Sequence, residues 1–258
     1  MMKKILFLLL SLWLLEFQAH AIDEKKLIDM TYPFAEETLH WPTAKPFKLE
    51  KVHEGMTPEG FWYSSYNYSA SEHVGTHLDA PFHFAHGKWT TDRIPLERTI
   101  GPGVVVDVRR KAEVDPDYQL QVVDIRMWER RRGKIPRGAI VFMYSGWGRF
   151  WDDRKRYFGT DQPGDVTHLH FPGFSREAAE FLVKERRIDA VGIDTPSIDY
   201  GRSRDFIVHQ IFGGANTPIF ENVASLDRLP SKGATIFAIP MKIQGGSGAP
   251  LRIFALLP

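Results

Sequence analysis

Residues 73–83 read HVGTHLDAPFH, and this stretch decides what kind of fold and site the chain can build. It holds three histidines and one aspartate, although the whole chain has only 10 histidines. Gly75 and the nearby Pro81 disfavour a helix here. In an extended strand, side chains alternate between two faces, so positions of equal parity share a face. We therefore expect His73, His77 and Asp79 to project from one side of a strand, with Gly75 leaving room for an ion.

Two imidazoles and one carboxylate are a common ligand set for a divalent cation such as Zn²⁺ or Mn²⁺. Three protein ligands leave coordination positions open, as in catalytic rather than closed structural sites. Pro81 is expected to end the strand and to turn the chain, which brings His83 back towards the same space. The pKa of histidine lies close to neutrality, so His83 is suited by type to proton transfer. A polar, histidine-rich loop without a metal is the alternative interpretation.

Other segments that could carry chemistry fit less well. His168 and His170 alternate on a possible strand, where a structural or pocket role is favoured over metal binding. Ser145 lies in MYSGWG, but Met143 stands where a nucleophile elbow needs its first glycine. The glycine-rich IQGGSGAP (243–250) lacks the Lys-Ser/Thr that follows a phosphate loop. The residues therefore favour metal-assisted hydrolysis over serine catalysis or nucleotide binding.

The composition narrows the class of protein further. With no cysteine among 258 residues, disulfides, thiolate zinc sites and cysteine nucleophiles are excluded. A formal net charge of +1 gives no reason to expect nucleic acid or a membrane surface as partner. Residues 1–21 combine a basic start, an apolar run of eleven residues and AHA, as in a signal peptide. We expect an exported protein, periplasmic or secreted, that starts near Ile22; a retained N-terminal anchor is the alternative.

The remainder, 22–258, is interpreted as one compact domain of mixed α and β structure. The segment 22–71 is rich in proline and aromatic residues and predicts short strands and loops. Helices are expected over about 121–132 and 175–187, the second with Ser175 as its N-cap. Apolar runs predict strands at the following positions: 103–108, 139–147, 189–197, 235–243 and 252–258.

The motif HVGTHLDAPFHF closely resembles the H-x-G-T-H-x-D-x-P-x-H signature of the metal-dependent cyclase family. That family includes bacterial kynurenine formamidases and isatin hydrolases. HWPTAKPF, RGAIVFMYSGW, FPGFS and the segment 192–223 also look like family segments, so the resemblance covers essentially the whole mature chain. It implies a single α/β domain of the swivelling β/β/α type, assembled into homodimers or larger homo-oligomers.

The resemblance also implies roles for particular residues. His73, His77 and Asp79 match the family's first metal ligands, and His83 matches its proton donor and acceptor. His209 and Glu221 match downstream ligands that complete a two-metal site in the formamidase branch, and Trp41 matches a tryptophan that contacts substrate there.

One departure from the formamidase pattern concerns the residue after His209. Formamidases tend to have a second histidine there, whereas this chain has Gln210. The His209–Gln210 pair looks more like that of isatin hydrolases, where a single manganese is expected. The resemblance therefore leaves open whether one ion or two ions bind. His209 could instead hold substrate or water. Gln210 could bind a metal weakly or donate a hydrogen bond to a substrate carbonyl. Aromatic residues near the motifs, Trp41 and Trp62 among them, favour a flat aromatic substrate.

Together these features predict a metal-dependent hydrolase of C–N amide bonds, with Mn²⁺ or Zn²⁺ as cofactor and a small lactam such as isatin as substrate. The first alternative is hydrolysis of N-formylkynurenine, the same chemistry on an open-chain formamide. The second is a periplasmic protein that binds a metal or ligand without turnover. A proton-transfer residue at position 83 favours an enzyme, because a pure binding site has no need for it.

Overall fold

Four parallel strands with nearly continuous apolar sequences form the centre of the fold. The computed structural model describes residues 23–258, so the signal peptide expected at 1–21 lies outside the described residues. The parallel strands are β5 (Ile100–Asp107), β7 (Ile140–Tyr144), β9 (Ala190–Ile193) and β10 (Ile219–Glu221). Their side chains alternate between two buried clusters, which explains why the strands are apolar except at their carboxyl ends.

Antiparallel strands extend this sheet until it closes on itself. The order is β12-β11-β5-β7-β9-β10-β4, and β4 also pairs with β12, so these strands form a barrel. The closing strands are β4 (His77–Asp79), β11 (Lys232–Pro240) and β12 (Gly248–Leu256), and β1 (Leu27–Asp29) adds to the edge of β12. Large side chains such as Phe142 and Phe220 fill the cluster on one face of the strands.

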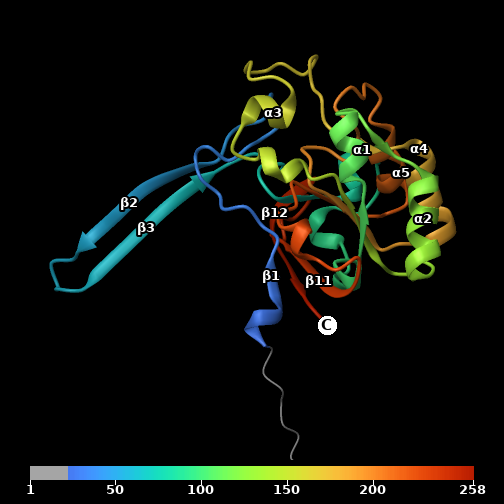
Figure 1. Ribbon diagram of the computed structural model, residues 1–258. Helices are drawn as coiled ribbons and strands as arrows, with labels where there is room; N and C mark the ends of the chain where they lie inside the picture. The colour runs from blue at the N-terminus through green and yellow to red at the C-terminus, as the bar shows by residue number, and fades with distance from the viewer. Residues whose placement is uncertain (1–22) are drawn as a thin grey trace, which may run out of the picture.

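Helices cover the opposite face of the parallel strands (Figure 1). The expected helix at 121–132 is α2 (Val122–Arg132), and the one at 175–187 is α4 (Arg176–Phe181) followed by a π-helical turn over Leu182–Arg186. Ser175 caps α4 as predicted, because its side chain accepts a hydrogen bond from the Ala178 amide. The sequence did not predict three further helices: α1 (Arg109–Val114), α3 (Arg154–Phe158) and α5 (Ile207–Gly214).

The shorter elements complete the chain. A small parallel pair consists of β6 (Gln119–Leu120) and β8 (Gly173–Phe174). The 3₁₀ turns are η1 (Glu24–Lys26), η2 (Pro81–His83), η3 (Thr91–Arg93), η4 (Leu96–Arg98), η5 (Trp147–Phe150) and η7 (Leu226–Arg228). Within residues 23–258, no helix has both the length and the apolar character needed to cross a membrane.

The segment 22–71 differs most from expectation. Residues 23–47 form the turn η1, the short strand β1 and loops, as expected, but 48–69 form one long hairpin from β2 (Lys48–Met56) and β3 (Trp62–Ser69). The hairpin projects away from the body of the molecule (Figure 1). Within the described part of the chain it pairs with no strand outside itself.

The strand expected through His73 is also shorter than predicted. Strand β4 begins at His77, and Gly75 adopts a left-handed backbone with φ of +58° that bends the chain ahead of it. A Cβ at position 75 would lie 2.9 Å from Thr38 Cγ2 and 3.0 Å from Phe34. Glycine is therefore needed for the bend and for close packing, and the predicted purpose of leaving room for an ion was wrong.

Candidate metal centre

The pairing of β4 with β10 brings together ligands that are far apart in the sequence. His77 lies directly opposite Glu221 in the antiparallel register. His77 Nε2 is 3.2 Å from Asp79 Oδ1 and 3.4 Å from Glu221 Oε2, and all three residues are buried. The imidazole is fixed because Nδ1 donates to the carbonyl of Gly75 at 2.9 Å. That bond leaves Nε2 facing the two carboxylates.

His73 reaches the same carboxylates from the bent segment before β4. Its Nδ1 is 2.6 Å from Asp79 Oδ1. Its Nε2 is 3.0 Å from Ser247 Oγ, which itself donates to Glu72 at 2.7 Å. The serine oxygen therefore accepts from His73 and aims Nδ1 at the site. The glycine-rich segment 243–250 packs closely against His73, since a Cβ on Gly248 would lie 2.5 Å from the His73 ring.

Helix α5 supplies His209, whose orientation is set by a carboxylate. Asp199 accepts from the backbone amides of Val208 and His209 at 3.1 Å each, and from His209 Nδ1 at 2.6 Å. The other ring nitrogen, Nε2, is thereby directed at Asp79 Oδ2 and Glu221 Oε1, each 3.2 Å away. Gly213 allows α5 to approach η2, because a Cβ there would lie 2.8 Å from the Pro81 carbonyl oxygen.

This cluster fits a divalent cation. Two groups of possible ligands lie close enough to hold an ion: His73, Asp79 and His83, and His77, Asp79 and Glu221. Asp79 belongs to both groups. His77 Nε2 is buried and has no hydrogen-bond partner among the described residues, as expected for an atom that ligates a metal. Nitrogen and oxygen donors without thiolate suit Zn²⁺ or Mn²⁺.

When no metal is bound, protons supply the positive charge that the buried carboxylates require. Burial lowers the pKa of His77, but the carboxylates of Asp79 and Glu221 beside Nε2 outweigh this effect and raise it to about 10. The pKa of His209 likewise rises well above its ordinary value, since burial is outweighed by Asp199, Asp79 and Glu221. Burial raises the pKa of Asp79, but the neighbouring histidines bring it well below the ordinary value.

We expect the affinity for a divalent cation to rise with pH because His77 must release its proton to bind a metal. The proton on His77 stabilises the metal-free protein fully below about pH 6.5, and this stabilisation is lost as the pH rises to about 10. The free energy of metal binding therefore becomes more favourable as the pH rises across this range. Calorimetric titration with Mn²⁺ or Zn²⁺ at several pH values tests this expectation, and an affinity independent of pH contradicts it.

His83 returns to the site as the sequence predicted. The turn η2 starts at Pro81, and the His83 ring stacks on His73 with centroids 4.0 Å apart. One side of the ring stays exposed, but loss of hydration on the stacked side lowers the pKa of His83 to about 4. Asp79 opposes this shift, while His73 and His209 add to it. The ring is therefore neutral at neutral pH and can accept a proton.

The cluster lies at one end of a cavity of about 250 Å³ with aromatic walls. Trp41, a predicted substrate contact, lines it and packs edge-on against Phe206 at 6.3 Å. Phe84 lies between Phe206 and His209, with its ring 4.4 Å from the imidazole. Phe158 completes the apolar lining.

Two predicted substrate contacts do not line this cavity. Gln210 is exposed on α5 and donates to the Asp205 carbonyl at 2.6 Å, because the helix turns it away from His209. Gln210 therefore does not line the cavity of its own chain. Trp62 begins β3 on the hairpin, which projects away from the body of the molecule, and it is 62% exposed. Its closeness in sequence to the motifs therefore did not bring it to the cavity of its own chain.

Sequence reasoning also missed residues that position the ligands. Asp199 precedes His209 by ten positions, and a carboxylate ahead of a candidate ligand could have suggested it. Ser247 and Phe206 gave no signal, because only the barrel closure and the bend before α5 bring them to the site.

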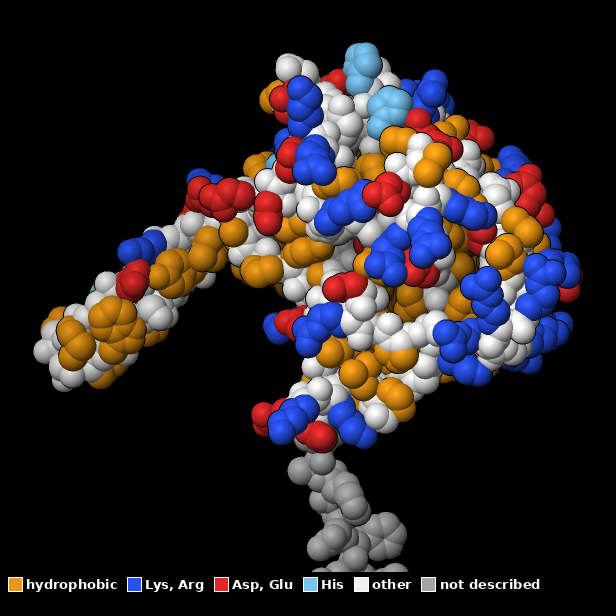
Figure 2. All heavy atoms as spheres, viewed as in Figure 1, with side chains coloured by type: hydrophobic (Ala, Val, Ile, Leu, Met, Phe, Trp, Pro, Cys, Tyr) orange, Lys and Arg blue, Asp and Glu red, His pale blue; other side chains and the backbone are white. Residues whose placement is uncertain are grey.

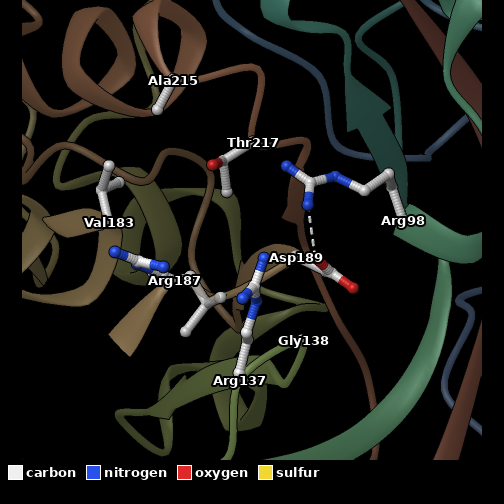
Figure 3. Close-up of a pocket in the computed structure, with 9 residues that line it drawn as sticks. Arg98, Arg137, Gly138, Val183, Arg187, Asp189, Ala215 and Thr217 are labelled. Atoms are coloured by element: carbon white, nitrogen blue, oxygen red, sulfur yellow. Dashed lines mark hydrogen bonds and ion pairs between the residues drawn. The ribbon is translucent and has the colours of Figure 1, made fainter. Parts of the chain in front are cut away.

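A second cavity, of about 480 Å³, shares no lining residue with the first, and Figure 3 shows the side chains that line it. It is lined by Arg98, Arg137 and Arg187 near the amino ends of β7 and β9, whereas Glu221 ends β10 at its carboxyl end. Arg98 pairs there with Asp189. Among the described residues that line this polar hollow there is no histidine.

His168, His170 and Ser145 lie outside the candidate metal centre, and each interacts with a carboxylate. His168 and His170 are exposed and pair with Asp165 and Asp117, respectively. Ser145 is buried and donates to Asp194 at 2.6 Å.

Comparison with known proteins identifies relatives over most of the described chain. The Cyclase family model matches residues 28–200. Isatin hydrolase of Roseibium aggregatum is 33% identical over 195 residues, which cover 72% of this chain and 72% of that protein. Kynurenine formamidase of Bacillus cereus is 26% identical over 230 residues, 87% of this chain and 94% of the relative. The structure of isatin hydrolase A from Ralstonia solanacearum matches with a TM-score of 0.81 at 32% identity, covering 90% of this chain and 92% of that one.

Proposed function

Because the chain belongs to the cyclase family and is related over most of its length to hydrolases, we propose that it hydrolyses C–N amide bonds in small cyclic amides of the isatin type. The observation that carries this proposal is the buried His77, Asp79 and Glu221 cluster beside a neutral His83. The cluster lies in a cavity with aromatic walls.

The proposed cofactor is one or two ions of Mn²⁺ or Zn²⁺, held by His73, His77, Asp79, Glu221 and His209. Such a cation polarises a carbonyl and makes water a better nucleophile near neutral pH. The chain holds these ligands rigidly, because Gly75, Ser247 and Asp199 each fix one imidazole. Rigid ligands keep the reacting groups aligned without a cost of reorganisation.

His83 is proposed to carry the proton between the attacking water and the departing nitrogen. It accepts a proton from the water as a C–O bond forms at the carbonyl carbon. It then donates that proton to the ring nitrogen as the C–N bond breaks, which leaves an aromatic amine and a carboxylic acid, and the acid releases its proton to solvent to give the carboxylate. Its lowered pKa leaves it unprotonated before attack, as a base must be.

The cavity favours a lactam over N-formylkynurenine. Its volume of about 250 Å³ lies below the usual range for drug-sized ligands, so it suits a compact ring. Among the described residues that line it there is no lysine or arginine to pair with the carboxylate of an amino-acid substrate. Trp41 and Phe206 instead offer faces for a flat ring.

The experiment is turnover by purified protein from which metal has been removed, with and without added Mn²⁺ or Zn²⁺, on isatin and N-formylkynurenine. We expect isatin to be opened only after a metal is restored, with a smaller kcat/KM for N-formylkynurenine. Preference for the open-chain substrate would assign the formamidase activity instead. Full activity in protein with no measurable metal would contradict the proposal, and metal binding without turnover of either amide would favour a binding protein.

A further inference from the structure

The second cavity, of about 480 Å³, carries positive charge that its one acidic residue does not balance. Three arginines line it together with Asp189, which forms an ion pair with Arg98. Arg98 is held further because it donates to the Asn216 carbonyl at 3.3 Å. Within residues 23–258, the side chains of Arg137 and Arg187 form no ion pair and no hydrogen bond. Two of the three guanidinium groups are therefore available to an anion.

The two unpaired arginines lie on turns that the backbone holds together. Arg137 lies shortly before β7 and Arg187 shortly before β9, and these strands are parallel neighbours. The Gly138 amide donates to the Arg187 carbonyl at 3.1 Å, and the Asp189 amide donates to the Ala139 carbonyl at 3.0 Å. Both arginine side chains line the same hollow (Figure 3). A ligand therefore has to order only the side chains and not the backbone that carries them.

Arg187 also has a backbone conformation that favours glycine. It follows the π-helical turn Leu182–Arg186 with φ and ψ of 51°, in the left-handed region. Glycine is the usual residue at such a helix end, because it lacks the Cβ that makes this conformation unfavourable. Residues held in unfavourable backbone conformations concentrate at functional sites. The arginine at position 187 thus indicates a role for its guanidinium rather than for the turn.

The chain that leads into the cavity adds a positive field. Residues 130–137 read RRRGKIPR, with five cations and no acidic residue. In the part of the chain that the structure describes, none of these five cations forms an ion pair. Figure 2 shows Lys and Arg side chains gathered over α2, which ends at Arg132. The net charge of +1 therefore conceals an uneven distribution, and this face attracts anions.

We propose that the second cavity binds a phosphate monoester, with Arg137 and Arg187 holding the phosphate group. A planar guanidinium pairs with two phosphate oxygens at once. A phosphate monoester carries a charge of roughly −1.5 to −2 at neutral pH and has three acceptor oxygens. This charge matches the two unpaired guanidinium groups, and the hydroxyl of Thr217, which also lines the cavity, can donate to a remaining oxygen.

The cavity also has room for the organic part of the ester. Its volume of about 480 Å³ lies within the usual range for small-molecule sites, which exceeds the need of a bare phosphate ion. Three apolar residues complete the lining: Val183, Ile188 and Ala215. They give the carbon skeleton of the ligand a surface to contact.

The first test is calorimetric titration of the purified protein with phenyl phosphate and with benzoate, which has the same ring but a single charge. We expect phenyl phosphate to bind more tightly than benzoate, and less tightly as the salt concentration rises. Arg137→Gln and Arg187→Gln should each weaken binding by ~10- to 100-fold. The matched control Arg130→Gln removes an exposed arginine from α2 and should change the affinity far less. Absence of binding by wild type, equal binding of benzoate, or full affinity in both cavity variants overturns the proposal.

The metal centre needs its own control, because phosphate also binds metal ions. Asp79→Asn removes a proposed metal ligand and should bind phenyl phosphate as tightly as wild type does. Loss of binding in this variant would place the phosphate at the metal centre and would overturn the proposal. Because these titrations do not involve turnover, their outcome is independent of whether the protein hydrolyses amides.

Arg187→Gly separates binding from stability. Glycine suits the left-handed backbone at this position, so the variant should lose affinity for phenyl phosphate without a fall in its unfolding temperature. Lost affinity together with a lower unfolding temperature would show that the side chain supports the fold and would overturn its assignment.

The source of the phosphate group is identified with vesicles. Sedimentation of the protein with vesicles that contain phosphatidic acid, but not with pure phosphatidylcholine vesicles, would assign the site to a lipid headgroup. Binding of phenyl phosphate without vesicle binding would assign it to a free phosphorylated compound. Arg187→Gln should abolish whichever interaction is found.

Discussion

Replacing Asp79 by asparagine is expected to abolish turnover, with a loss of at least about 10³-fold in kcat/KM, or ~4 kcal/mol of transition-state stabilisation. Asp79 belongs to both groups of possible metal ligands and lies within 3.2 Å of His73, His77 and His209 nitrogens. Asparagine keeps the shape but removes the negative charge that a cation and the imidazoles require. Metal content measured on the purified variant should fall together with activity.

The matched control for this change is Asp161→Asn, which makes the same chemical substitution on an exposed loop. We expect this variant to keep wild-type activity and metal content. Asp79→Asn that retains both would show that the carboxylate is not a ligand, and the proposed centre would have to be abandoned.

Replacing His83 by alanine is expected to lower kcat by roughly 10²–10⁴-fold while the metal stays bound. The ring is neutral at neutral pH and stacks on His73 at the edge of the cluster, where it can exchange a proton with substrate. The buried group of His77, Asp79 and Glu221 does not include His83, so a cation can still be held. Steady-state kinetics and metal analysis on the same preparation separate the two effects.

His86→Ala provides the control, since it removes another exposed imidazole three positions further along the chain. It should leave kcat and metal content unchanged. If His83→Ala instead loses the metal, His83 is a ligand in the group with His73 and Asp79, and the proton carrier must be sought elsewhere.

The sequence predicted the elements of this site that lie close together along the chain. HVGTHLDAPFH identified His73, His77, Asp79 and His83 because groups within eleven residues of one another stay close in space, and Pro81 restricts the turn that leads to His83. The apolar runs predicted three of the four parallel strands, β5, β7 and β9, but not the short β10, since a strand buried on both faces tolerates few polar residues. The resemblance to a family then indicated His209 and Glu221, which periodicity did not single out.

Only the tertiary structure decided which distant groups meet. Asp199 and Ser247 fix the ligand imidazoles because α5 packs on η2 and β12 closes the barrel against β4. The structure also shows that Gln210 and Trp62 do not line the cavity of their own chain. Helix α5 directs Gln210 away from His209, and the long β2–β3 hairpin carries Trp62 away from the body, although both residues are close in sequence to the site.

Local sequence therefore determined which chemical groups this protein has and which segment, 73–83, carries His73, His77, Asp79 and His83. Long-range packing determined their partners, their protonation and the walls of the cavity. The physical reason is that hydrogen-bond geometry and pKa depend on neighbours within a few ångströms, and several of those neighbours come from segments more than 100 positions away, as Glu221 and Ser247 do from His77 and His73.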